Sequence, residues 1–137
     1  MATTYPLGAT LARVNSDLEE FRIYRERMNE KIREAGNLTV NRFFALDGRA
    51  YEKGLLGTAT KELLGLVASL VLRCDDCISY HLVRCREEGW SDEELFEAFA
   101  VALVVGGSIV IPHLRRAVDF LEGLPPGQPP TQGKGGR

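Results

Sequence analysis

Apolar residues recur at steps of three and four positions through most of the chain between residues 16 and 122. This spacing places them on one face of an α-helix, whereas the alternating pattern of a β-strand is scarce. The sequence therefore predicts an all-α fold of about six helices. The expected helices cover residues 17–35, 40–55, 58–71 and 74–88, followed by one that begins after Ser91 and one that begins after Gly107.

Local signals mark several helix ends. Gly36 and Asn37 are expected to end the first helix, because both residue types favour the left-handed conformation that closes helices. Ser91 with Glu94 three residues later is typical of a capping box, which starts a helix. Taken together, the expected helices indicate one helical domain over residues 17–122. An N-terminal extension (1–16) precedes it, and a flexible tail (123–137) rich in proline, glycine and polar residues follows it.

The most apolar segment, residues 95–111, is interrupted by Glu97 and by Gly106-Gly107. It falls short of the roughly 18 uninterrupted apolar residues of a membrane span, so we expect it in the core and expect no membrane partner. A helix this apolar in so small a domain has more surface to cover than one copy can cover. The sequence therefore predicts a homo-oligomer whose subunits meet through apolar helix faces.

Composition narrows the class of function. The 137 residues suffice for one ordinary domain, and 17 basic against 19 acidic residues give a formal net charge of -2. Nucleic acid is not an expected partner, because no excess of positive charge is available for phosphates. Three cysteines are too few for a secreted disulfide framework, and the amino terminus has no signal-peptide pattern. We therefore expect a cytoplasmic protein.

The candidate chemistry lies in one segment, where Cys74-x-x-Cys77 is followed four residues later by His81. On a helix these three side chains fall within about 60° of one another and share one face. Two cysteines three positions apart at a helix start can close a disulfide, which makes a two-electron switch. A helix amino terminus favours Cys74 as the reactive thiolate, whereas a neighbouring imidazole favours Cys77. The sequence leaves both open.

Two other interpretations of these residues stay open. A zinc site cannot include both Cys74 and Cys85, because about 16 Å of helical rise separates them. A site of Cys74, Cys77, His81 and an outside ligand is still allowed. Alternatively, the cysteine pair is buried core, which is the expected place of Cys85. We expect His113, at a helix start, to be a structural histidine.

Glu62 lies on an otherwise apolar helix, twelve residues before Cys74. Its pattern alone slightly favours an exposed acid near the helix start over a buried base. The spacing Glu62-x11-Cys74-x2-Cys77-x3-His81, within residues 40–122, resembles the alkylhydroperoxidase D-like branch of the carboxymuconolactone decarboxylase superfamily. The resemblance implies a compact helical fold that assembles into trimers or hexamers. It also implies a thiol-dependent peroxidase or disulfide reductase. Such an enzyme needs no bound organic cofactor, and we do not expect a metal.

The resemblance implies a role for each residue of the motif. Cys74 and Cys77 are the redox pair, His81 is the proton-transfer partner of Cys77, and Glu62 is the acid that relays protons to His81. The resulting hypothesis is an enzyme that reduces a small hydroperoxide and is re-reduced by a thiol or protein reductant.

The two residues between the cysteines depart from the pattern of the peroxidase members, in which a histidine often precedes the second cysteine. Here Asp75 and Asp76 fill the gap, and their charges are expected to oppose thiolate formation by repulsion. Two other functions stay open. One is a non-catalytic or redox-sensing helical oligomer. The other is the lactone or decarboxylation chemistry of the wider superfamily, which the cysteine pair disfavours.

Overall fold

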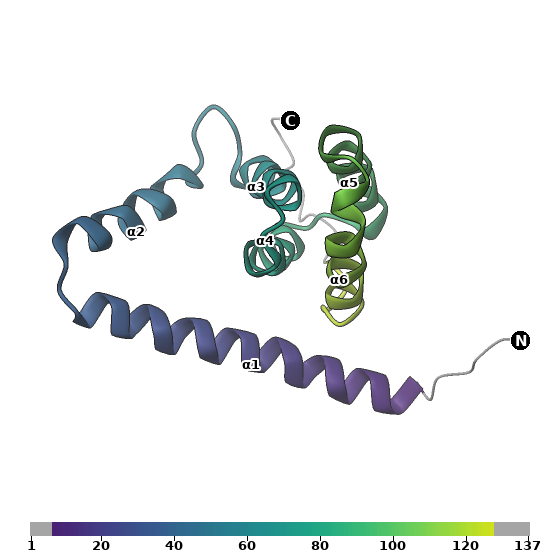
Figure 1. Cartoon of the computed structure of the whole chain (residues 1–137), viewed down its shortest axis with the longest axis horizontal. Helices are drawn as coiled ribbons and strands as arrows, with labels where there is room; N and C mark the ends of the chain where they lie inside the picture. Colours follow the sequence, from purple (N-terminus) through teal and green to yellow (C-terminus); the bar gives the residue numbers. More distant parts are fainter. Residues whose placement is uncertain (1–6, 128–137) are drawn as a thin grey trace, which may run out of the picture. The chain divides into compact units, whose positions relative to one another are not determined.

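Six α-helices and one short 3-10 helix make up the described part of the chain, residues 7–127, in this computed structural model (Figure 1). They are α1 (Leu7–Glu34), α2 (Leu38–Ala50), α3 (Thr58–Leu72), α4 (Asp75–Glu87), α5 (Asp92–Gly106), η1 (Ser108–Val110) and α6 (Ile111–Glu122). No β-strand occurs within residues 7–127, and the predicted all-α class is confirmed. Side chains are described from residue 17. Most of the tail expected over 123–137 lies outside the described residues.

The first helix is longer than predicted. α1 begins at Leu7 rather than at Asp17 and includes residues 7–16, which were expected to precede the helical domain. That segment contains no proline, and its one glycine, Gly8, lies at the second position of the helix, so no strong helix breaker interrupts it. The end of α1 agrees with the prediction, because Gly36 follows it with a φ of 73°.

The second helix is shorter than predicted. Asn37 caps its start, with Oδ1 accepting a hydrogen bond from the Val40 N–H at 3.0 Å. The helix ends at Ala50 rather than at Leu55. After it, the Glu52 carbonyl accepts a 2.6 Å hydrogen bond from Lys61 Nζ, which holds this segment against the first turn of α3.

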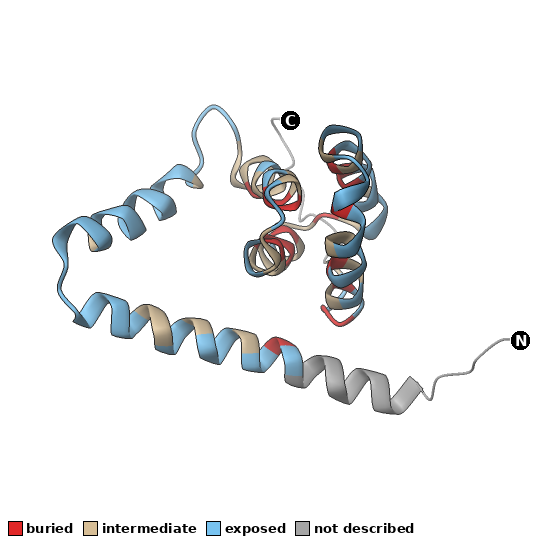
Figure 2. Cartoon of the chain, in the orientation of Figure 1, coloured by how far each residue is buried: buried red, intermediate tan, exposed pale blue. Residues whose placement is uncertain are grey.

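The chain divides between Ala50 and Tyr51 into two compact units. In the first unit, α1 and α2 contact each other, and Leu18 is the one buried side chain among residues 17–50. No residue of α2 is buried (Figure 2). Phe43 on this helix lies largely exposed. The first unit therefore buries almost no apolar surface within residues 17–50.

The second unit contains the hydrophobic core. Helix α3 packs against α4 and α5, and α6 packs against α4. The largest fully buried apolar side chains on these helices and η1 are Leu66, Leu70, Ile78, Leu82, Leu95, Phe99 and Val110. In the turn between α4 and α5, the Trp90 indole N–H donates a 2.9 Å hydrogen bond to the Ala59 carbonyl. Ser91 Oγ accepts the Glu94 N–H at 3.2 Å and caps α5, as predicted.

The turn between α3 and α4 positions the cysteine pair. Arg73 has a left-handed conformation (φ 60°, ψ 41°), and its N–H bonds to the Leu70 carbonyl at 3.1 Å. The N–H of Cys74 bonds to the Ser69 carbonyl at the same distance, which completes a Schellman motif. Cys74 is then the N-cap of α4. The chain thus turns within two residues, and α4 packs back against α3.

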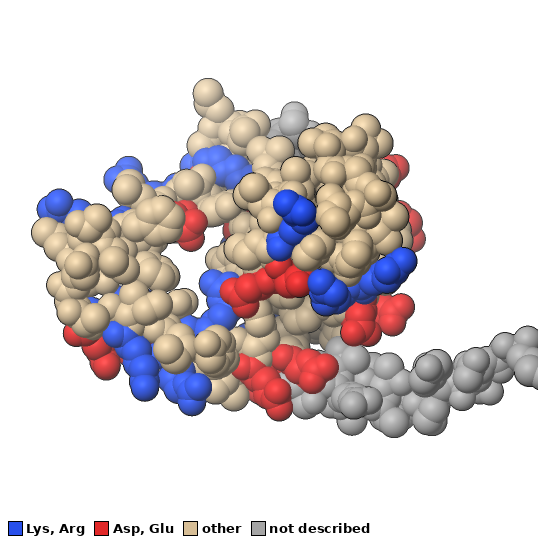
Figure 3. Space-filling model, in the orientation of Figure 1, with Lys and Arg blue, Asp and Glu red and all other residues tan. Residues whose placement is uncertain are grey.

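Part of the second unit exposes a large apolar surface. Figure 3 shows mostly uncharged surface over α5 in this view. The exposed large apolar side chains of α5 are Phe96, Val101, Val104 and Val105. Surfaces of this kind mark interaction sites. No helix among those described is long and apolar enough to cross a membrane.

Candidate functional site

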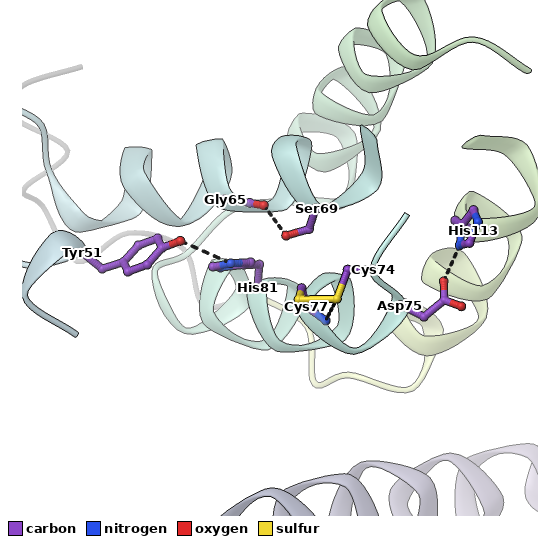
Figure 4. Close-up of a disulfide and its surroundings, with 8 residues drawn as sticks. All are labelled: Tyr51, Gly65, Ser69, Cys74, Asp75, Cys77, His81 and His113. Atoms are coloured by element: carbon purple, nitrogen blue, oxygen red, sulfur yellow. Dashed lines mark hydrogen bonds and ion pairs between the residues drawn. A yellow bond between two sulfur atoms is a disulfide. The ribbon is translucent and has the colours of Figure 1, made fainter. Parts of the chain in front are cut away.

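A disulfide joins Cys74 and Cys77 at the amino end of α4, with the two α-carbons 5.3 Å apart (Figure 4). Cys74 Sγ also accepts a hydrogen bond from the Cys77 N–H at 3.3 Å, because Cys74 is the helix N-cap. Backbone N–H groups at this end of a helix favour negative charge. After reduction they would stabilise a thiolate. Cys77 is exposed, whereas Cys74 is partly buried.

Glu62 and His81 meet in the interior of the α3–α4 pair. Glu62 is 1% and His81 7% exposed, and His81 Nδ1 lies 2.8 Å from Glu62 Oε2. The exposed acid that the pattern alone favoured at position 62 is therefore wrong. An ionised carboxylate only accepts hydrogen bonds, so with Glu62 ionised His81 Nδ1 carries a proton and donates it. This contact orients the imidazole.

Tyr51 contacts the other nitrogen of His81. Its hydroxyl lies 3.4 Å from His81 Nε2 (Figure 4). With Nδ1–H donated to Glu62, Nε2 of a neutral imidazole accepts the tyrosine O–H. Both ring nitrogens are then engaged, and no hydrogen bond links His81 to Cys74 or Cys77 among the described side chains. Proton transfer between Cys77 and His81 stays a prediction.

Arg84 brings positive charge to the buried carboxylate. Its Nε lies 3.4 Å from Glu62 Oε1, and its guanidinium also pairs with Glu87 and Glu88. Burial acts to lower the pKa of Arg84, but Glu87 and Glu62 outweigh it and raise the pKa above its ordinary value. The buried charge of Glu62 is thus matched by donors. Arg84 was not among the residues predicted from the sequence, although it follows His81 by three positions on the same helix.

Gly65 makes room for the imidazole. A Cβ atom at position 65 would lie 2.6 Å from His81 Cε1 and 2.8 Å from Nε2. The His81 ring therefore lies directly against the backbone of α3. Gly65 was also missed, although it follows Glu62 by three positions and so shares its helix face.

A second charged cluster lies beside Cys74. Asp75 is the first residue of α4 and accepts hydrogen bonds from His113 Nδ1 at 2.7 Å and Arg116 Nε at 3.0 Å, both on α6. Partial burial acts to raise the pKa of Asp75, but the bonds from His113 and Arg116 lower it below its ordinary value. The Asp75 charge that was expected to oppose thiolate formation is thus paired. His113, expected to be merely structural, contacts the cysteine segment.

Cys85 is free and lies in the core, as expected. Burial, followed by the charges of Glu62 and Glu88, raises the pKa of its thiol. Within residues 7–127, no group of three or more His, Cys, Asp or Glu side chains is placed to hold a metal ion.

The fold and the site together define a helical protein with a cysteine pair that closes into a disulfide beside a buried Glu–His pair. The model of the carboxymuconolactone decarboxylase family matches residues 37–120. The chain belongs to this family, which agrees with the resemblance seen in the sequence.

Solved structures extend this result. Two crystal structures of a carboxymuconolactone decarboxylase family protein from Thermotoga maritima are 65% and 64% identical to the chain, with TM-scores of 0.73 and 0.74. They cover 75% and 76% of this chain and 87% and 91% of their own. An involvement in the antioxidative response has been suggested for that protein. A family member from Legionella pneumophila shares the fold (23% identity, TM-score 0.57, covering 84% of this chain and 93% of its own).

Among other similar proteins is uncharacterized protein 4 in the cox locus of Paracoccus denitrificans. It is 30% identical over 88 residues, which are 64% of this chain and 79% of that protein.

Gly65→Ala is expected to lower the melting temperature, because the new methyl group collides with the His81 ring. Without a collision, alanine in a helix interior is more stable than glycine by about 1 kcal/mol. The collision is specific to His81, so Gly65→Ala should instead stabilise the His81→Ala chain. Thermal unfolding measures the melting temperatures of the unsubstituted protein, the two single variants and the double variant. A Gly65→Ala chain that melts higher than the unsubstituted protein would contradict the contact.

Asp75→Asn is expected to reduce stability above pH ~4 and to have no effect near pH ~2. The pKa of Asp75 is lowered by folding, so its contribution is present above its unfolded value and is lost as the pH falls through its folded value. We expect a difference of about 0.5 to 1 kcal/mol, because the side chain is 45% exposed. Denaturant unfolding across this pH range measures it. Asp76→Asn, which removes an acid from the same helical turn, is the control.

Proposed function

We propose that the chain is a thiol-dependent peroxidase that reduces a small hydroperoxide through the Cys74–Cys77 pair. The observation that carries the proposal is the disulfide at the start of α4, one turn before a buried His81 that is hydrogen-bonded to Glu62. Membership of the family and the antioxidative role suggested for the Thermotoga maritima protein support it. No organic cofactor is needed, because the thiols themselves carry the two electrons.

Cys77 is the proposed attacking thiol. It is exposed, so a hydroperoxide can reach it, and it precedes His81 by one helical turn. Cys74 is less exposed, and its sulfur faces the Cys77 N–H. It is the proposed resolving thiol.

The reaction then has three steps. The Cys77 thiolate attacks a peroxide oxygen and becomes a sulfenic acid, while the O–O bond breaks and the alkoxide takes up a proton to leave as an alcohol. The Cys74 thiolate attacks the sulfenic sulfur, which forms the disulfide and releases hydroxide that leaves as water with a proton. Two reductant thiols reopen this disulfide and become a disulfide themselves. One hydroperoxide and two thiols thus yield an alcohol, water and a disulfide.

His81 and Glu62 are the proposed proton relay. His81 takes the proton of the Cys77 thiol and returns it to the departing alkoxide, and the Glu62 carboxylate, 2.8 Å from Nδ1, stabilises the imidazolium in between. The Tyr51 hydroxyl occupies Nε2 in the oxidised protein and both donates and accepts protons. We assign it the outer position of the relay. Re-reduction fits the thiol pool of the cytoplasm, which is the proposed location.

Reduced protein is expected to consume cumene hydroperoxide for many turnovers when a thiol reductant is present. Cys77→Ser should abolish turnover, and Cys74→Ser should stop after one equivalent with a sulfenic acid that dimedone labels. Glu62→Gln should lower the rate about 100-fold, because it keeps the shape but removes the relay charge. Hydroperoxide loss over time is the measurement.

The matched control for this experiment is Cys85→Ala. Cys85 is buried and its thiol pKa is raised, so the variant should retain the full rate. If the unsubstituted protein stops after a single equivalent, the redox-sensing alternative holds. Activity that survives replacement of both Cys74 and Cys77 would instead indicate lactone or decarboxylation chemistry.

We also propose that a second copy of the chain covers the exposed apolar face of α5, within the trimer or hexamer that the sequence resemblance implies. Val104 is 86% exposed and is adjacent to the exposed Val105. Val104→Asp is expected to shift the mass measured by light scattering toward that of one chain. Glu122→Gln, a change at an exposed position of α6, should leave the mass unchanged. An unsubstituted protein that is monomeric at micromolar concentration would refute this contact.

A further inference from the structure

The carboxylate of Asp75 is held away from the disulfide that it adjoins in sequence. Figure 4 shows its side chain directed toward His113 on α6. Arg116, one turn further along the same helix, holds the second carboxylate oxygen at 3.0 Å. Both oxygens of Asp75 are thus bound by α6, although Asp75 itself is the first residue of α4, directly after Cys74.

The contacts of Asp75 with His113 and Arg116 reduce the net negative charge beside Cys74. An unpaired carboxylate at this position would repel a thiolate on the neighbouring residue. Arg116 is always charged and cancels one negative charge. His113 Nδ1 donates a hydrogen bond to the other carboxylate oxygen. The cluster of Asp75, His113 and Arg116 therefore carries no net negative charge, although it includes an acid of the Cys-x-x-Cys segment.

We propose that His113 and Arg116 are positioning residues that set the reduction potential of the Cys74–Cys77 pair by holding and neutralising the Asp75 carboxylate. The inference rests on the proposed function only in that the pair cycles between disulfide and dithiol. It requires no peroxide. Sequence spacing offers no sign of it, because α6 follows the cysteines by more than 30 residues.

The direction of the effect follows from the exchange equilibrium. The protein disulfide and two glutathione thiols give the protein dithiol and one glutathione disulfide. Surroundings that stabilise a thiolate stabilise the reduced form and raise the reduction potential. Removing the positive charge of Arg116 should therefore shift the equilibrium toward the protein disulfide, and removing the negative charge of Asp75 should shift it toward the dithiol.

The experiment equilibrates the full chain in glutathione buffers of graded ratio and measures the oxidised fraction by thiol alkylation and mass spectrometry. Arg116→Gln and His113→Gln are each expected to favour the disulfide about threefold or more, which corresponds to a potential about 14 mV lower. Arg116→Lys keeps the positive charge, so its disulfide equilibrium should lie close to that of the unsubstituted protein. Asp75→Asn should shift the equilibrium in the opposite direction.

Two controls test whether Arg116 acts through Asp75 and not merely through its own positive charge. Arg115→Gln removes the same charge from an exposed neighbour that has no ion pair with a described residue, and should shift the equilibrium less than twofold. Arg116→Gln should lose most of its effect in the Asp75→Asn chain, because Arg116 acts through that carboxylate. Equal shifts for Arg115→Gln and Arg116→Gln, or an undiminished shift in the Asp75→Asn chain, would overturn the proposal. A protein without peroxide turnover whose potentials shift as expected would contradict only the peroxidase function.

Discussion

The carboxylate of Glu62 is almost wholly removed from water, and a charge in such a place must be matched by hydrogen-bond donors. His81 and Arg84, one helical turn apart on α4, supply those donors. This requirement fixes how α4 is rotated against α3, while Gly65 allows the two helices to approach at the imidazole. The same rotation leaves Cys77, one turn before His81, open to solvent. One buried acid thus orients the helix that carries the exposed Cys77.

Three helices contribute different parts of the site. Helix α3 supplies the acid, α4 supplies both thiols and the histidine, and α6 supplies the partners of Asp75. The turn at Arg73 and Cys74 links the first two, because it closes one helix and begins the next with a cysteine as its cap. The cysteine pair is therefore held at a fixed junction rather than on a loop.

Most of the helices could be predicted because their periodicity is local, and so could the disulfide that the spacing of Cys74 and Cys77 allows. The burial of Glu62 could not, since acids near helix starts are usually exposed and only the family resemblance favoured an inward position. Gly65 and Arg84 follow Glu62 and His81 by three residues, so their places could have been found. Tyr51 and His113 could not, because they reach the site from elements distant in sequence. The start of α1 was misjudged because residues 7–16 contain no proline, and their one glycine lies at the second position of the helix, so no strong helix breaker separates them from Asp17.

The first unit buries little apolar surface of its own within residues 17–50, and this bears on the stability of its two helices. With Leu18 as the one buried side chain among residues 17–50, the described side chains of α1 and α2 add little free energy of folding by packing on one another. An apolar surface outside the pair that packed against their exposed side chains would stabilise both helices. If that surface belongs to another subunit, folding and assembly are linked by mass action, and dilution alone weakens both. Proteases would then cleave this pair of helices first at low concentration.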